Sequence, residues 1–75
     1  MDTVISYDPD DGRYLLSPKD KLSDVLGRVQ HDLSTGELWR VWGVRPGGSE
    51  EYLGVFYEDE DAWAALMQHA ESREK

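Results

Sequence analysis

The sequence predicts an α+β domain in which four mainly antiparallel strands and two helices follow one another in the order ββαββα. Two segment pairs are rich in β-branched and aromatic residues, and each pair is joined by a turn-forming sequence. Each pair is followed by a stretch with apolar residues at helical spacing. The chain of 75 residues has the length of one domain, so residues 1–75 are predicted to form a single small acidic unit.

The first strand pair consists of residues 3–7 (TVISY) and 13–16 (RYLL). β-Branched and aromatic residues favour the extended backbone of a strand. The connecting residues 8–12 (DPDDG) suit a turn, because Pro9 fixes φ, aspartates bond to nearby amides and Gly12 tolerates positive φ. These segments predict an N-terminal β-hairpin.

A first helix is predicted from Ser17 to Gly36. Ser17 is a suitable N-cap, Pro18 is a suitable first helical residue and Gly36 is a suitable terminator. Five apolar residues between them recur at i, i+3, i+4, i+7 and i+11, which defines one helical stripe. The stripe consists of Leu22, Val25, Leu26, Val29 and Leu33. Gly27 opposes this prediction, because a glycine inside a helix costs up to about 1 kcal/mol relative to alanine.

The second half repeats this plan. Residues 37–45 (ELWRVWGVR) and 51–57 (EYLGVFY) are strand-like, and the Arg45-Pro46-Gly47-Gly48 sequence between them is typical of a type II turn. A last helix is predicted over residues 59–72, with apolar residues at i, i+3, i+4 and i+7. These residues are Trp63, Leu66, Met67 and Ala70.

Charge restricts the partners. Sixteen Asp and Glu against eight Lys and Arg give a net charge of −8. Nucleic acids and anionic membranes are bound through Lys and Arg, so neither is an expected partner. The expected partner is a basic protein surface, such as a nucleic-acid-binding protein or complex. The chain has no cysteine, no apolar run near the roughly 20 residues of a membrane span and no basic segment after Met1, so a cytoplasmic location is expected.

The acids concentrate in residues 50–61, where six carboxylates fall within twelve residues without a Lys or Arg. The block 58–61 opens the last predicted helix, where carboxylates meet the positive end of the helix dipole and Asp59 is a suitable N-cap. Four consecutive acids exceed what one cap requires, so the excess is available to a basic partner. The candidate acidic contacts are Glu50, Glu51, Glu58, Asp59, Glu60 and Asp61.

The strands predict an aromatic contact as well. Residues 38–45 place Trp39 and Trp42 on opposite faces, and neither face of residues 52–57 is polar. If both helices cover one face of the sheet, the other face exposes aromatic surface of the kind that marks a contact, and a homodimer is its first expected use. A bulge at Gly43 or one helix on each face are the alternatives. Trp39 and Trp42 are the candidate aromatic contacts, of which at most one is expected to be exposed.

The stretch YDPDDGRYLL is similar over ten residues to the opening of MbtH-like proteins, which are small partners of peptide synthetase adenylation domains. The Ser-Leu-Trp-Pro segment of that family does not follow. The function of the family is therefore not transferred to this chain.

Catalytic, metal-binding and cofactor-binding residues are not predicted. His31 and His69 are expected on separate helices without a cysteine partner, and no glycine-rich phosphate loop follows a strand. The preferred hypothesis is a non-catalytic inhibitor, an acidic phage-type host-takeover protein of the anti-CRISPR or nucleic-acid-mimic class, that blocks a basic nucleic-acid-binding protein. The alternative is a cellular protein–protein interaction module, homodimeric through an exposed aromatic sheet face. An acidic surface adapted to high salt ranks below both.

Overall fold

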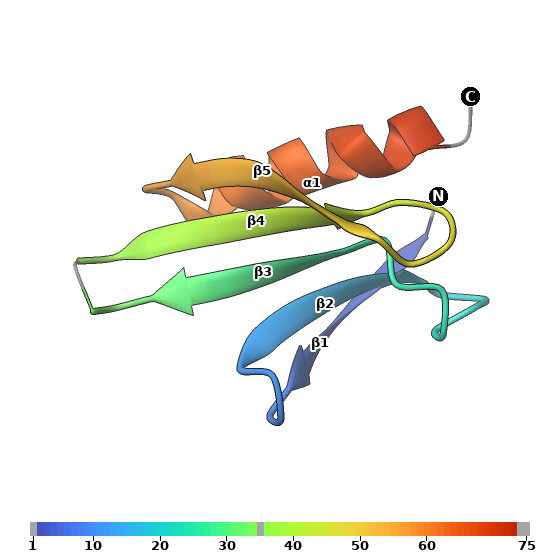
Figure 1. Cartoon of the computed structure of the whole chain (residues 1–75), viewed down its shortest axis with the longest axis horizontal. Helices are drawn as coiled ribbons and strands as arrows, with labels where there is room; N and C mark the ends of the chain where they lie inside the picture. Colours follow the sequence, from blue (N-terminus) through green and yellow to red (C-terminus); the bar gives the residue numbers. More distant parts are fainter. Residues whose placement is uncertain (1, 35, 74–75) are drawn as a thin grey trace.

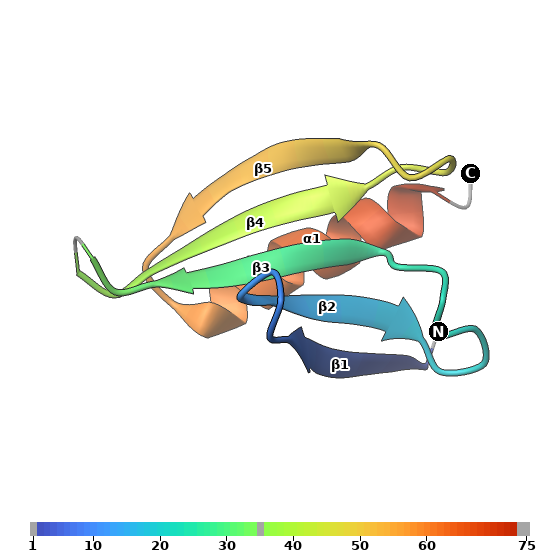
Figure 2. The same ribbon diagram turned by 60° about the horizontal axis from the view of Figure 1, so that its bottom comes forward.

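The computed structural model describes residues 2–34 and 36–73. Within them the elements are β1 (Thr3–Asp8), β2 (Arg13–Pro18), β3 (Gly27–Asp32), β4 (Leu38–Val44), β5 (Glu50–Phe56) and α1 (Asp59–Arg73). The strands form one antiparallel sheet in the order β1-β2-β3-β4-β5, so each strand pairs with its neighbours in sequence. Helix α1 lies behind the sheet in Figure 1, and Figure 2 shows it crossing behind β3 and β4.

The predicted order ββαββα is wrong, because the described residues form five strands and one helix. The segment predicted as the first helix is divided between a loop and β3. Strand β2 continues through Ser17 to Pro18, and successive turns follow it. The Lys21 N–H donates to the Pro18 carbonyl at 3.2 Å and the Asp24 N–H to the Lys21 carbonyl at 3.0 Å. Ser17 and Pro18, which are predicted to start a helix, therefore end strand β2, and the residues after them form turns.

Residues 27–32 alternate with a period of two, as in a strand. Gly27 and Val29 face α1, whereas Arg28, on the same strand between them, faces away and takes part in ion pairs. Of the predicted helical stripe, Leu22 is 62 % exposed and Leu33 is 67 % exposed. Gly27 also has a packing role that a helix would not give it: a Cβ there would lie 2.0 Å from Leu66 Cδ1. Sheet packing therefore decides the structure of this segment against a local 3.6-residue pattern.

The predicted last helix is confirmed as α1, which packs on β3, β4 and β5. Ala62, Leu66 and Ala70, spaced four residues apart, form its buried face. Val29 and Val41, directly opposite each other on β3 and β4, are fully buried beneath it. The core cluster consists of Leu16, Leu26, Val29, Val41, Ala62, Leu66 and Ala70.

Both predicted hairpins are confirmed. In the first, Gly12 has φ +73° and its N–H donates to the Asp8 carbonyl at 2.8 Å. In the second, the Gly48 N–H donates to the Arg45 carbonyl at 2.9 Å and Gly47 has φ +100°. A four-residue hydrogen-bonded turn with a left-handed glycine in the third position is the predicted type II geometry.

A bulge interrupts the pairing of β4 with β5. Val41 opposes Gly54 whereas the next residue, Trp42, opposes Tyr52, so Leu53 is the extra residue. The bulge therefore lies in β5 and not at Gly43, the position predicted as one alternative. It changes the parity of β5, because Tyr52 shares the face of Trp42 whereas Phe56 shares the opposite face with Trp39.

Within the described chain, α1 is too short and too polar to cross a membrane.

Candidate functional site

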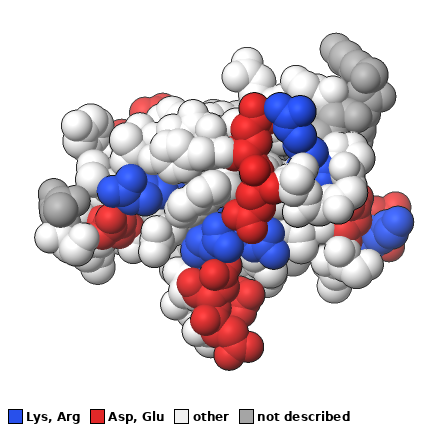
Figure 3. All heavy atoms as spheres, in the orientation of Figure 1, with Lys and Arg blue, Asp and Glu red and all other residues white. Residues whose placement is uncertain are grey.

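The candidate site is the sheet face opposite α1, here called the helix-free face. Alternate residues of each strand point away from the helix. Four neighbouring strands contribute the central residues of this face. They are Arg13 on β2, Arg28 on β3, Arg40 and Trp42 on β4, and Glu50 and Tyr52 on β5. Figure 3, which views the molecule as Figure 1 does, shows Lys and Arg side chains gathered at the centre with Asp and Glu above and below them.

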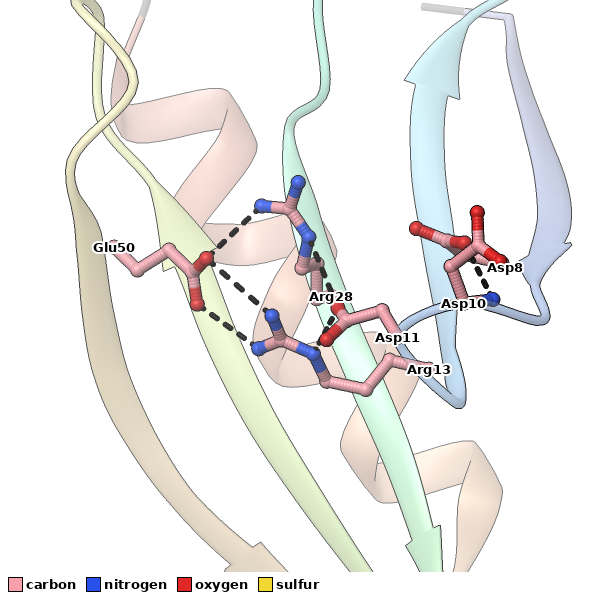
Figure 4. Close-up of polar contacts among 6 residues, drawn as sticks. All are labelled: Asp8, Asp10, Asp11, Arg13, Arg28 and Glu50. Atoms are coloured by element: carbon pink, nitrogen blue, oxygen red, sulfur yellow. Dashed lines mark hydrogen bonds and ion pairs between the residues drawn. The ribbon is translucent and has the colours of Figure 1, made fainter.

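Glu50 joins two arginines across the sheet (Figure 4). Arg13 Nη1–H donates to Glu50 Oε1 at 2.9 Å, and Arg28 Nη1–H donates to Glu50 Oε2 at 3.1 Å. The carboxylate of Asp11 contacts Nε of both arginines from the β1–β2 turn. Burial acts to lower the pKa of Arg13, but its hydrogen bonds with Glu50 and Asp11 outweigh burial and hold that pKa above the ordinary value. Two cations and two anions therefore form one charge-balanced network.

An aromatic pair lies beside this network. The Arg13 guanidinium carbon is 4.8 Å from the centre of the Trp42 ring, a cation–π distance. On β5 the Tyr52 ring lies 5.7 Å from the Trp42 ring at 59°, and Arg40 Nη1–H donates to the Tyr52 hydroxyl at 3.3 Å. Trp42 is half-buried and Tyr52 is 51 % exposed. The arginines thus hold both rings in place while leaving Tyr52 accessible.

Arg40 is held in turn by Asp32. Its Nε–H donates to Asp32 Oδ2 at 3.2 Å, and Asp32 Oδ1 accepts from the Ser34 hydroxyl at 2.6 Å and the Ser34 N–H at 2.9 Å. The Ser34 hydroxyl, the Ser34 N–H and Arg40, in that order, lower the pKa of Asp32 below its ordinary 3.8. Asp32 is therefore ionised at neutral pH, and the third arginine of the face is also balanced by a carboxylate.

The two tryptophans predicted as contacts lie on opposite sides of the sheet. Trp39 shares the helix side with His31, whose ring stacks on it at 3.8 Å with an interplanar angle of 3°. Trp39 also packs against the core cluster. Trp42 is therefore the tryptophan that belongs to the helix-free face.

The six predicted acidic contacts do not form one surface. Glu50 and its neighbour Glu51 point to opposite faces of β5. Glu51 faces α1, where Arg45 Nη2 lies 2.9 Å from its Oε1 and His69 Nε2 lies 3.3 Å from its Oε2. The hydrogen bond from Arg45, and then the one with His69, lowers the pKa of Glu51. Both acids at the start of β5 are thus engaged within the protein.

The acidic block 58–61 lies at the other end of β5. Glu58 is eight positions after Glu50, which corresponds to about 26 Å of extended chain. The helix begins at Asp59, whose carboxylate accepts a hydrogen bond from the Glu60 N–H at 2.8 Å. Glu58, Glu60 and Asp61 are exposed, and their carboxylates form no ion pair among the described residues. Asp59 is exposed too and forms no ion pair among the described residues, so four of the six acids keep an unneutralised charge.

Sequence reasoning missed the arginines of the helix-free face. Arg28 and Asp32 fell in the segment predicted as a helix, and Arg13 was treated as part of an isolated hairpin. The signal that could have found them is the alternation of small or apolar with polar residues in 27–30 (GRVQ), which places Arg28 beside Arg13 and Trp42 once the segment is a strand.

Among the residues that the structure describes, no group of three His, Asp or Glu side chains is placed to hold a metal ion. Comparison of the chain with protein-family profiles, curated protein sequences and solved structures finds no match.

Proposed function

We propose that the chain is a non-catalytic protein-binding module whose contact surface is the helix-free face. The observation that carries the proposal is the Trp42–Tyr52 pair, which is fixed by arginines and lies beside a charge-balanced network. Trp, Tyr and Arg are the residues that most often dominate the binding energy of protein interfaces. The cytoplasm is the compartment that we propose for it, because the chain contains no cysteine for disulfides.

Two physical properties favour this face. Its rings are already held by Arg13 and Arg40, so little side-chain entropy is lost when a partner binds. Its three arginines are balanced by Asp11, Glu50 and Asp32, so a partner meets no net charge there although the whole chain carries −8. Binding through such a face is expected to depend weakly on salt.

The test is a pull-down with the tagged chain at 50 mM and 500 mM NaCl, in which proteins retained by the wild type are compared with those retained by variants. Tyr52→Ala is expected to lose the specific partner by at least tenfold. Tyr57→Ala is the matched control, because Tyr57 is 81 % exposed beyond the end of β5. Equal retention by both variants would contradict the proposal. Sedimentation of the purified chain shows whether the captured partner is a second copy.

A second candidate function is the inhibitor that mimics nucleic acid and blocks a basic nucleic-acid-binding protein. The exposed and unpaired carboxylates of Glu58, Glu60 and Asp61 favour it. Under this hypothesis the partner is released at 500 mM NaCl and by reversing these three charges to lysine, whereas Tyr52→Ala retains it. The same pull-down therefore separates the two candidates.

A further inference from the structure

The two edges of the sheet differ in how they are protected against pairing. The edge strand β5 contains Glu50 and Glu51, a bulge at Leu53, and Gly54 with φ +139°. Charges and bulges are the devices that prevent an edge from pairing with another chain. The opposite edge, β1, has no bulge, because its six residues pair with β2 in one unbroken register, and its one charged residue is Asp8 at its end.

Strand β1 also presents apolar side chains on the helix side of the sheet, beyond the part that α1 covers. Figure 2 shows β1 at the edge remote from β5, with α1 crossing behind β3 and β4. Ile5 is 54 % exposed and Tyr7 is 55 % exposed, although their strand neighbours Leu16 and Tyr14 belong to the core cluster or pack on it. A strand added to β1 would cover Ile5 and Tyr7 and satisfy the outward backbone groups of the edge.

The charges at the ends of β1 determine what that strand can be. Asp2 precedes the uncharged stretch and Asp8 follows it. In a two-fold antiparallel dimer that pairs the uncharged residues 3–7 of the two copies, the register centres on Ile5 and places Asp2 of each copy opposite Asp8 of the other. Directly opposed like charges destabilise a strand pair, so a second copy is disfavoured. Basic residues at both ends of an incoming strand are complementary instead.

We propose that β1 is a docking edge for an extended segment of a partner protein that has alternating apolar residues and a Lys or Arg at each end. This site is separate from the helix-free face and does not depend on the function proposed for that face. Backbone hydrogen bonds along β1 supply affinity, contacts with Ile5 and Tyr7 select apolar side chains, and Asp2 and Asp8 select the basic ends.

The experiment uses the full ¹⁵N-labelled chain and two blocked synthetic peptides, Arg-Val-Thr-Val-Thr-Val-Arg and Glu-Val-Thr-Val-Thr-Val-Glu, whose second and fourth residues lie opposite Tyr7 and Ile5 when the end residues lie opposite Asp8 and Asp2. The arginine peptide is expected to shift the amide signals of Thr3–Asp8 and to bind at least tenfold more tightly than the glutamate peptide. Ile5→Lys is expected to weaken binding at least tenfold. Val55→Lys is the matched control, because Val55 is 45 % exposed on the other edge strand, and its affinity is expected to stay within twofold of the wild type.

Charge selection is tested separately by Asp2→Lys, which lies before the strand and should reduce the preference for the arginine peptide without changing the fold. Tyr52→Ala should bind the peptide normally, so failure of the function proposed for the helix-free face is distinguishable from failure here. Absence of shifts in Thr3–Asp8, equal binding of both peptides, or equal effects of Ile5→Lys and Val55→Lys would overturn the proposal. Self-association of the chain that Ile5→Lys abolishes would overturn it too, in favour of a second copy.

Discussion

Two opposed glycines set how closely α1 approaches the sheet. Gly27 on β3 pairs with Gly43 on β4, and both face the helix. A Cβ at Gly27 would lie 2.0 Å from Leu66 Cδ1 and 2.8 Å from the backbone oxygen of Trp42. A Cβ at Gly43 would meet atoms of the His69 ring at 2.5 Å. At Gly27 the obstacles are a backbone oxygen and the fully buried Leu66 side chain. At Gly43 the obstacle is the His69 side chain, which lies at the margin of the core.

Gly27→Ala is therefore expected to lower the free energy of unfolding by about 1–3 kcal/mol, the usual range for overpacking a core. Gly43→Ala is expected to cost less, because the His69 ring can turn outward. Urea denaturation of both variants measures the difference. A greater loss for Gly43→Ala would show that the His69 ring is fixed, and a neutral Gly27→Ala would show that Leu66 does not pack on β3.

The two tryptophans show how the spacing between two residues of a strand, odd or even, decides whether they lie on opposite faces or on one face of the sheet. Trp39 and Trp42 are three positions apart, an odd number, so a strand places them on opposite faces. The sequence alone established this separation. It did not establish which tryptophan meets the helix, because that depends on which side of the sheet α1 packs.

At the level of elements, prediction succeeded where the decisive interactions are local. The DPDDG and Arg45-Pro46-Gly47-Gly48 turns are determined by their own residues, and the last helix has acidic residues at its start and one buried stripe. Residues 17–36 failed because their apolar spacing fits a helix, whereas the deciding contact, Gly27 against Leu66, joins residues 39 positions apart. The helix-free face was missed for the same reason, since Arg13, Arg28 and Glu50 meet through sheet register.

The acids of α1 should have opposite effects at its two ends. Glu60 lies in the first turn and Glu71 near the end, and residues 59–72 contain no Lys or Arg. Carboxylates stabilise the positive N-terminus of a helix and destabilise the negative C-terminus. Glu60→Gln is expected to lower stability by about 0.3–1 kcal/mol and Glu71→Gln to raise it by a similar amount, measured by thermal unfolding. Equal signs for the two isosteric changes would contradict a dipole role for the first-turn acids.

At the scale of the whole molecule, the ion pairs of the arginines and the acids that have no cationic neighbour lie in different parts of the surface. Arg13, Arg28, Arg40 and Arg45 are each within 4 Å of a carboxylate. The excess negative charge therefore resides elsewhere, including the start of α1 and the exposed residues of the β1–β2 turn. Ion pairs in contact are screened less by salt than repulsion over longer distances.

Stability is consequently expected to rise between 0.01 M and 0.1 M NaCl, as the Debye length falls from about 30 Å to about 10 Å. For a domain of this size, a gain of about 1 kcal/mol corresponds to an increase in Tm of about 4–8 °C. The control is the variant Asp10→Asn/Asp20→Asn/Glu71→Gln, which carries three fewer negative charges at exposed positions and should gain less. A fall in Tm with salt would mean that the arginine pairs outweigh the repulsion. The helix-free face would then be a main source of stability, and removing Glu50, which joins two of its arginines, should destabilise the fold more than removing any exposed acid.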